Sequence, residues 1–204
     1  MFIVAIEGLD KAGKFTQVNL LTQKLRNEGY RVQVSEFHRY DTPTGSLIMK
    51  WLKKEWEASQ STIEMIMTAD KQNQQEWFQM LEQQEYDLLI LDRYILSQAA
   101  YAVANGVDGK WLLDLQRYMR KPDLDIVIDI PPEESIRRKG KYGENDRYEE
   151  DKNLLEKVRE NYLSFSTDYS APIKKVVNGF RDVNDIHDVI YEIVKNFLEG
   201  ERNG

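Results

Sequence analysis

Residues 8 to 16 read Gly-Leu-Asp-Lys-Ala-Gly-Lys-Phe-Thr and lie between an apolar stretch, residues 2 to 6, and a segment with helical periodicity that begins at about Lys14. The apolar stretch is typical of a strand buried on both faces of a parallel sheet. Gly8 and Gly13 let backbone N–H groups turn toward an anion, the helix N-terminus adds a favourable dipole, and Lys14 adds a positive charge. The pattern therefore predicts a strand, a phosphate-binding loop and a helix.

One position departs from the usual phosphate-binding loop. The residue after Lys14 is normally Ser or Thr, whose hydroxyl binds Mg²⁺, and here it is Phe15. Thr16 comes one place later, where a helical step of about 100° turns its hydroxyl away from the usual ligand direction. We therefore expect Mg²⁺ to depend on phosphates, water and another carboxylate, and the candidate is Asp92, which ends a predicted strand.

Composition narrows the class of protein. The 204 residues are 41% hydrophobic, which is enough for one α/β domain, and the net charge of −7 argues against a general nucleic-acid binder. The absence of cysteine excludes disulfides and thiolate chemistry and fits a reducing compartment. No apolar run reaches the roughly 20 residues of a membrane span, and we expect no signal peptide. We predict a single cytoplasmic domain over residues 1–204 without a membrane partner.

Strand and helix patterns alternate along the chain. Strands are predicted at residues 2–6, 30–37, 87–92, 124–130 and 174–177, and helices at about 14–28, 46–84 in two stretches of which the second is long and begins at 62, 97–104, 109–119, 133–139, 148–165 and 186–198. This alternation predicts a three-layer α/β/α fold with a central parallel five-stranded sheet, whose ligands bind at the carboxyl ends of the strands.

Charged side chains follow several predicted strands. Arg39 comes after the second strand, and Asp92-Arg93-Tyr94 ends the third. An arginine there can bind a phosphate with two parallel hydrogen bonds, and the alternative for each cluster is a solvated strand end with a local ion pair, an alternative that carries more weight for Arg39 than for Asp92-Arg93-Tyr94. Residues 137 to 147 mix five basic residues with two glycines, which suits a small helical lid at about 137–150 that closes over phosphates, or else a charged surface loop.

Four groups of residues together resemble the thymidylate kinases, which transfer the γ-phosphate of ATP to dTMP. They are Glu7-Gly8-Leu9-Asp10-Lys11-Ala12-Gly13-Lys14; Phe37-His38-Arg39-Tyr40 with Thr42-Pro43-Thr44-Gly45; Asp92-Arg93-Tyr94 with Ser97-Gln98 and Ala100-Tyr101; and Asp146-Arg147-Tyr148-Glu149. They follow the family's order and spacing over most of the chain. The resemblance implies a P-loop nucleoside monophosphate kinase fold, ATP and Mg²⁺ as cofactors, and a homodimer.

The resemblance also implies residue roles. Asp10 would lie near the sugar 3′-hydroxyl, Arg39 and Arg93 on the acceptor phosphate, and Lys14 on the donor phosphates, with Lys11 as the catalytic cation of the loop. Tyr101 would pack beneath the deoxyribose and Gln98 would contact the base. The expected ATP-binding set is Gly8, Lys11, Ala12, Gly13, Lys14, Phe15, Thr16, Arg137 and Arg147. The expected substrate-binding set is Asp10, Phe37, Arg39, Tyr40, Met67, Lys71, Arg93, Ser97, Gln98, Tyr101, Tyr148 and Glu149.

Three departures from the family pattern affect these expectations. Besides Phe15, His38 replaces the usual proline, and Met67 and Lys71 replace the Phe and Arg that stack on thymine and hydrogen-bond its carbonyl. Met still offers a polarisable apolar surface and Lys still donates, although both fit a flat base less rigidly. A modified pyrimidine or a broader set of deoxynucleoside monophosphates therefore stays open, as does the division of labour between Lys11 and the lid arginines.

Two other functions remain alternatives at this stage. A deoxynucleoside kinase would need a carboxylate after the second strand as a general base, and Glu36 is next to that position. A non-catalytic nucleotide-binding module would explain Phe15 but leaves Arg39, Arg93 and Arg147 without a role. An arginine near an acceptor phosphate favours a monophosphate acceptor over either alternative.

Overall fold

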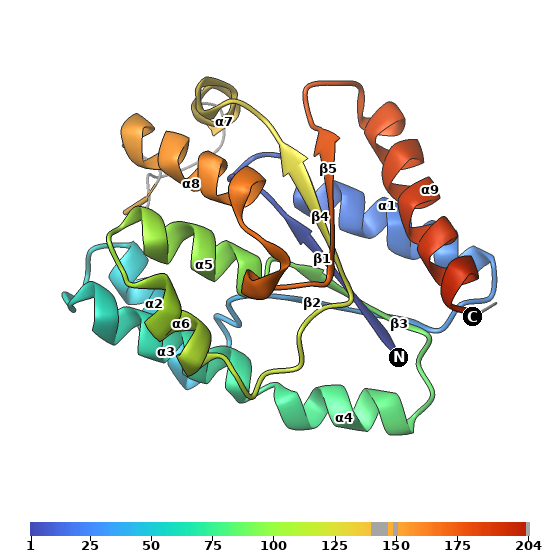
Figure 1. Cartoon of the computed structure of the whole chain (residues 1–204), viewed down its shortest axis with the longest axis horizontal. Helices are drawn as coiled ribbons and strands as arrows, with labels where there is room; N and C mark the ends of the chain where they lie inside the picture. Colours follow the sequence, from blue (N-terminus) through green and yellow to red (C-terminus); the bar gives the residue numbers. More distant parts are fainter. Residues whose placement is uncertain (140–146, 149–150, 203–204) are drawn as a thin grey trace.

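The computed structural model describes residues 1–139, 147–148 and 151–202, and the described chain forms a five-stranded parallel sheet between two layers of helices (Figure 1). The strands are β1 (Phe2–Glu7), β2 (Val32–Glu36), β3 (Leu88–Asp92), β4 (Leu124–Asp129) and β5 (Ile173–Asn178). Their order across the sheet is β2-β3-β1-β4-β5, and every neighbouring pair is parallel. The predicted α/β/α architecture is confirmed.

The helices follow the strands along the chain. They are α1 (Lys14–Asn27), α2 (Pro43–Leu52), α3 (Gln60–Gln72), α4 (Gln75–Gln83), α5 (Ile95–Ala104), α6 (Gly109–Leu115), α7 (Pro132–Lys139), α8 (Lys152–Ser164) and α9 (Val183–Arg202), with a short 3₁₀ turn at Thr167–Tyr169. Helices α1 and α9 lie together on one side of the sheet, and α5 and α8 lie together on the other (Figure 1).

Alternating side chains of the strands explain these two layers. Val4 and Ile90 point to the side of α1, where they share a core with Leu21. Ile3 and Leu89 point to the opposite side, where α4 and α5 cover them. All four strand residues have no exposed surface, which is why the strands read as continuous apolar runs rather than as alternating ones.

Several predicted helix boundaries were wrong, three of them instructively. The long second helical stretch is divided into α3 and α4 at Asn73 and Gln74, a break that the apolar periodicity does not mark. The helix predicted over 109–119 ends at Leu115. The helix predicted from Tyr148 begins at Lys152 because the Asp151 carboxylate caps it, accepting a hydrogen bond from the Leu154 N–H at 3.1 Å.

Candidate active site

The loop predicted to bind phosphate connects β1 to α1 with the positive φ angles that such a loop needs. Gly8 and Gly13 have φ angles of 135° and 97°, and a Cβ at Gly8 would lie 2.4 Å from the carbonyl oxygen of Ile128. The buried Lys14 ammonium donates to the Leu9 carbonyl at 2.9 Å and lies 3.9 Å from the Asp10 carboxylate. Burial, with the charge of Arg93, lowers the pKa of Lys14 to about 8. The loop thus encloses a cation beneath its backbone.

Arg93 crosses from the end of β3 to this loop. Its Nη1 donates to the Gly8 carbonyl at 3.1 Å and to the Ser97 hydroxyl at 3.3 Å, and its Nη2 pairs with Asp10. Burial would raise the pKa of Asp10, but the charges of Arg93 and Lys14 lower it to about 2. The arginine and the carboxylate therefore stand as a charged pair at the meeting point of β1 and β3.

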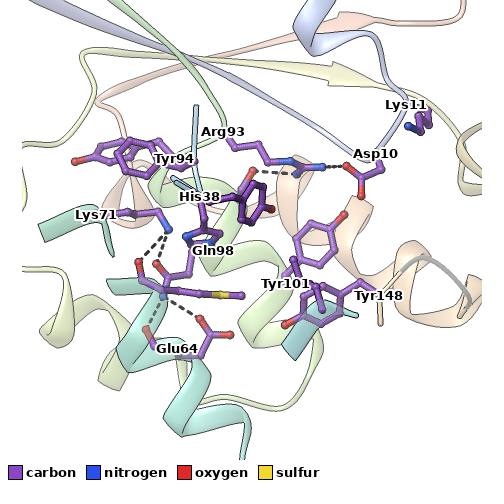
Figure 2. A pocket seen from close by; sticks show the side chains of 15 residues that line it. Asp10, Lys11, His38, Glu64, Lys71, Arg93, Tyr94, Gln98, Tyr101 and Tyr148 are labelled. Carbon is purple, nitrogen blue, oxygen red and sulfur yellow. Dashed lines mark hydrogen bonds and ion pairs between the residues drawn. The ribbon is translucent and has the colours of Figure 1, made fainter. Parts of the chain in front are cut away.

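A pocket of about 280 Å³, here called the aromatic pocket, opens beside this pair. Figure 2 shows Lys71, Gln98 and Glu64 on one side of it and Arg93 with Asp10 on the other. The rings of Tyr101 and Tyr148 lie 5.0 Å apart in its wall. The full lining is Asp10, Lys11, Phe37, His38, Tyr40, Leu52, Glu64, Met67, Lys71, Arg93, Tyr94, Ser97, Gln98, Tyr101 and Tyr148.

A buried polar network forms the deep wall of the aromatic pocket. Lys71 Nζ donates to Gln98 Oε1 at 3.0 Å, and Gln116 donates to the same oxygen at 2.9 Å. Gln98 Nε2 donates to the Glu64 carboxylate at 2.9 Å and to the Thr68 hydroxyl at 3.1 Å. Gln98, expected to contact a base, is thus engaged by protein groups on both sides of its amide and orients Lys71.

His38, which also lines the aromatic pocket, is tied to the buried carboxylate of Asp70, with Nδ1 and Oδ2 at 3.3 Å. Burial and the charge of Lys71 lower the pKa of His38 to about 4, although Asp70 opposes the shift. The imidazole is therefore neutral at physiological pH. This pairing was not predicted from the sequence, because nothing in the sequence indicates that residues 38 and 70 meet.

A second cavity of about 510 Å³, here called the loop cavity, adjoins the aromatic pocket along the phosphate-binding loop. It is lined by Asp10, Lys11, Gly13, Lys14, Phe15, Thr16, Glu36, Phe37, Tyr40, Asp92, Arg93 and Arg138. Five residues line both spaces: Asp10, Lys11, Phe37, Tyr40 and Arg93. The two cavities therefore meet at the charged pair of Arg93 and Asp10.

Three arginines that the sequence assigned to phosphates lie elsewhere. Asp41 accepts from Arg39 at 3.1 and 3.2 Å, so that guanidinium lines neither the aromatic pocket nor the loop cavity. Arg147 lies over the Trp51 ring, 4.6 Å from its centroid, and donates to the Trp51 carbonyl and to Glu57. The guanidinium groups of Arg39 and Arg147 are thus hydrogen-bonded to nearby carboxylates and carbonyls.

The third arginine belongs to the predicted lid. Glu134 pairs with both Arg137 and Arg138, but of the two it is Arg138 that also reaches the Lys11 carbonyl, at 3.2 Å, and lines the loop cavity. Arg138 was missed because adjacent residues of a helix point in different directions, and only packing selects between them. Gly8 and Ala12 support the loop without lining the cavity. Glu149 and residues 140–146 of the lid lie outside the described residues.

Oxygen ligands for a metal are limited at this site. Among the described residues, no group of three or more His, Cys, Asp and Glu side chains could hold a metal ion. Asp92 and Glu36 are direct neighbours across β2 and β3 and both line the loop cavity, where carboxylates suit Mg²⁺ when phosphates and water complete its shell. The exposed Phe15 ring offers no ligand.

The family model for thymidylate kinase matches residues 6–190. A probable thymidylate kinase of Thermococcus kodakarensis is 33% identical over 98% of this chain and all of its own, and the thymidylate kinase of Schizosaccharomyces pombe is 30% identical over 95% of this chain and 91% of its own. The solved structure of thymidylate kinase from Candida albicans superposes with a TM-score of 0.82 at 28% identity, covering 96% of this chain and 91% of that one.

None of the helices in the described part of the chain is long and apolar enough to cross a membrane.

The family model and these relatives match nearly the whole chain. The parallel sheet, the phosphate-binding loop and the two joined cavities fit the same family. The chain therefore belongs to the thymidylate kinase family of ATP-dependent nucleoside monophosphate kinases.

Proposed function

We propose that this chain transfers the γ-phosphate of ATP to dTMP, giving ADP and dTDP, by binding dTMP in the aromatic pocket and the ATP phosphates in the loop cavity. The observation that carries this assignment is that the two cavities share a wall at Arg93, Asp10 and Lys11. Phosphoryl transfer requires donor and acceptor in line with little solvent between them, and positive charge where the transferred group passes. Adjoining cavities with a partly buried arginine at the junction satisfy both needs.

On the acceptor side, Met67 supplies an apolar surface for the base and Lys71 a buried donor for a base carbonyl. Phe37, Tyr40, Tyr101 and Tyr148 line the space left for the sugar and base, with Ser97 close to Arg93. Arg93 binds the acceptor phosphate, and Asp10 accepts from the 3′-hydroxyl.

Arg39 reaches the same phosphate only by leaving Asp41. Its pair with Asp41 is solvent-exposed and therefore weak, so a doubly charged phosphate can compete for the guanidinium. Glu149 belongs to the proposed acceptor set by resemblance.

On the donor side, the backbone of Gly8, Ala12 and Gly13 surrounds the phosphates, and Lys14 neutralises them from beneath. Lys11, which lines both cavities, supplies the cation nearest the transferred group. Phe15 and Thr16 border the phosphates, and Arg138 lies closer to them than Arg137 does. Arg138 donates a hydrogen bond to the Lys11 carbonyl, so the positions of Arg138 and Lys11, the two candidate cations, depend on each other.

Asp92 would hold Mg²⁺ through water, with Glu36 beside it. Bound there, the ion would neutralise charge on the donor phosphates. A cytoplasmic homodimer built from one domain over residues 1–204, with a lid at about 137–150, is part of the same proposal and rests on the resemblance.

The assay that tests the proposal measures ADP release with ATP and Mg²⁺ against dTMP, dUMP, 5-substituted dUMPs, dCMP, dGMP, dAMP and thymidine. We expect turnover with dTMP above all others. Thymidine alone would make the chain a nucleoside kinase, several bases would make it a broad kinase, and ATP binding without turnover would make it a binding module.

We expect Lys14→Ala and Arg93→Ala each to lower kcat/KM by at least about a hundredfold, because each removes a charge that faces transferred or accepting phosphate. The matched control is Arg117→Ala, which removes an exposed arginine at the end of α6 and should leave turnover unchanged. Full activity of Lys14→Ala or Arg93→Ala would refute the assignment.

A further inference from the structure

Glu7, the last residue of β1, is a fully buried carboxylate with no part in the reaction scheme above. One of its oxygens accepts a hydrogen bond from the Tyr94 N–H at 2.9 Å, and the other accepts from the Ser97 hydroxyl. Both donors belong to the first turn of α5 or the residue before it. Burying a carboxylate is costly unless its oxygens are hydrogen-bonded, and these two hydrogen bonds are what allow Glu7 to be buried here.

One of these hydrogen bonds acts on the backbone next to Arg93, and the other acts, through Ser97, on the Arg93 guanidinium. Tyr94 follows Arg93 directly, and Arg93 has a φ angle of 66°, a left-handed conformation that is costly for a residue with a side chain. Fixing the next N–H stabilises that turn at the point where β3 ends. At the other end, the Ser97 oxygen that donates to Glu7 accepts from Arg93 Nη1 at 3.3 Å and lies 2.7 Å from the Tyr162 hydroxyl.

The surroundings of Glu7 disfavour the ionised form of its carboxyl group. Burial, followed by the nearby charge of Asp125 on β4, raises the pKa of Glu7 to about 7, while Ser97 and Arg93 oppose the shift. In return, the charge of Glu7 helps to keep Lys14 and Lys71 protonated, and it raises the pKa of the Tyr162 phenol. The Glu7 carboxyl, whose ionised form is disfavoured by burial, therefore interacts electrostatically with Arg93, Lys14, Lys71 and Tyr162 around the reaction site.

We propose that Glu7 is a positioning residue for Arg93, fixing the backbone turn through Tyr94 and the guanidinium through Ser97. This inference rests on the proposed function, in which Arg93 binds the acceptor phosphate. Glu7 touches neither the aromatic pocket nor the loop cavity, so it acts through Arg93 rather than on the nucleotides.

The test is Glu7→Gln, which keeps the shape but replaces one accepting oxygen with an N–H₂ that donates to Ser97. That reversed hydrogen bond competes with Arg93 Nη1 for the Ser97 oxygen. We expect kcat/KM for dTMP to fall about a hundredfold, the loss typical of a small displacement at a reaction site, with a raised KM for dTMP and the KM for ATP changed less than about twofold.

A second readout separates positioning from a purely structural role. Because the native state raises the pKa of Glu7 above its unfolded value, the ionised carboxyl destabilises the fold above pH 7, and Glu7→Gln should not lower Tm at pH 8. Asp125→Asn is the matched control, since Asp125 is also buried with a raised pKa on the same face of the sheet, but its carboxylate accepts from the Ala171 N–H rather than from Tyr94 or Ser97. Loss of its charge favours the ionised, hydrogen-bond-accepting form of Glu7. Asp125→Asn should retain full kcat/KM for dTMP.

The kinetics of Glu7→Gln and Arg93→Ala together decide the inference. Loss of activity on dTMP with an unchanged KM for ATP and an unreduced Tm in Glu7→Gln supports it. Unchanged kinetics in Glu7→Gln, while Arg93→Ala is inactive, would overturn it and leave the proposed function standing, whereas an active Arg93→Ala would refute the function itself. If Glu7→Gln does not fold, Ser97→Ala decides: about a tenfold fall in kcat/KM for dTMP supports the link through Ser97, and no fall overturns it.

Discussion

Lys71 is a buried ammonium group whose charge depends on pH in the working range. Burial lowers its pKa to about 8, and the charges of Asp70, Glu64 and Glu7 oppose the shift only in part. Its side chain is held by Gln98 on the wall of the aromatic pocket, so it keeps its place whether or not it is charged. In the proposed function, the charge state of this one residue therefore affects how strongly the aromatic pocket attracts a base carbonyl.

We expect the KM for dTMP to rise as pH increases through 8, on the order of tenfold between pH 7 and pH 9, because most Lys71 side chains lose their proton over that interval. The matched control is Lys71→Arg, whose guanidinium stays protonated. Its KM should be flat over the same interval, measured by initial rates at saturating ATP. A wild-type KM that does not change with pH would remove Lys71 from base recognition.

Phe15 is 70% exposed beside the loop cavity and packs against little of the fold. We expect Phe15→Ser and Phe15→Thr to retain activity and to need less Mg²⁺ for half-maximal rate, because each restores a hydroxyl at the usual ligand position. Titration of the rate with Mg²⁺ at fixed ATP measures the change. Phe15→Ala is the control without a hydroxyl, and a collapse of activity in all three variants would show that the ring itself contacts the nucleotide.

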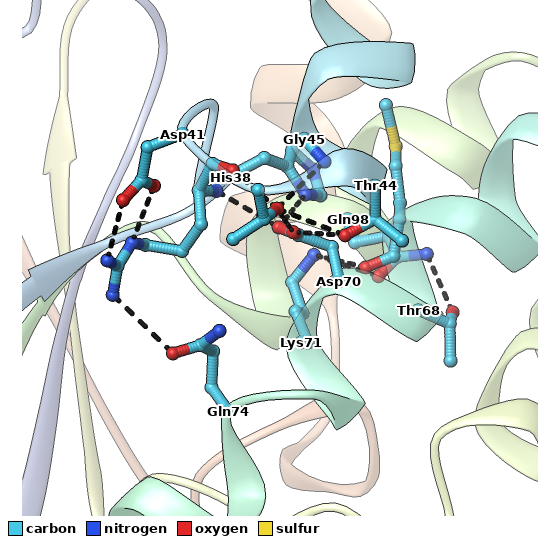
Figure 3. A network of polar contacts seen from close by, with 12 residues as sticks. His38, Asp41, Thr44, Gly45, Thr68, Asp70, Lys71, Gln74 and Gln98 are labelled. Atoms are coloured by element: carbon cyan, nitrogen blue, oxygen red, sulfur yellow. Dashed lines mark hydrogen bonds and ion pairs between the residues drawn. The ribbon is translucent and has the colours of Figure 1, made fainter.

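The connection between β2 and α2 is held by one carboxylate of α3. Asp70 accepts from the Arg39 N–H at 3.0 Å and from the hydroxyls of Thr42 and Thr44 at 2.9 and 2.8 Å. Figure 3 shows Thr44 and His38 beside Asp70. Because His38 and Tyr40 belong to this connection and line the aromatic pocket, its order sets the wall of that pocket as well as the start of α2.

We expect Asp70→Ala to lower the free energy of unfolding by about 3 kcal/mol, since it leaves several buried donors without acceptors. Urea unfolding at pH 7 measures this change. The control is Asp41→Ala, which removes an exposed carboxylate from the same connection and should leave the urea midpoint unchanged. Equal midpoints for wild type and Asp70→Ala would contradict the role of Asp70.

The same contribution should depend on pH. Burial alone would raise the pKa of Asp70, but hydrogen bonds from His38, Arg39 and Thr44 lower it to about 2, below the ordinary value of 3.8. A carboxyl with a depressed native pKa stabilises the fold above its unfolded pKa and loses that effect as the pH falls through the native one. The stability difference between wild type and Asp70→Ala should therefore shrink between pH 4 and pH 2.

At the scale of the molecule, the parallel sheet gathers the reactive groups at one edge. Ile6 and Glu36 both lie level with Asp92 in the strand register, so the ends of β1, β2 and β3 open onto the same space.

Helices α2 and α3, which pack on each other, carry the exposed apolar side chains Leu47 and Met65. Such side chains suit a contact with a second subunit.

We expect sedimentation equilibrium to give twice the chain mass of 24.0 kDa for the wild type. Met65→Glu places a charge in the expected contact and should shift the mass toward one chain as the protein is diluted. The control is Tyr118→Glu, a substitution at an exposed residue just beyond α6, which should leave the mass unchanged. A single-chain mass for the wild type at all concentrations would exclude the homodimer.

Local order along the chain was enough to predict most of the architecture and part of the site. The five strands and the loop after β1 follow from apolar runs, periodicity and glycine spacing, which are properties of neighbouring residues. Lys14 and Arg93 were placed at the candidate site for the same reason, because residues just beyond the carboxyl end of a parallel strand, or at the start of the helix that follows, lie at the edge of the sheet where ligands bind.

Tertiary structure alone decided where the long side chains go. Arg39 binds Asp41, Arg147 lies on Trp51, Gln98 is engaged by Lys71 and Glu64, and Arg138 rather than Arg137 reaches the loop. Long side chains have several rotamers of similar energy, and partners from distant segments select among them. The burial of Glu7 against α5 is likewise a property of two packed elements, and the amino-acid sequence contains no local signal for it.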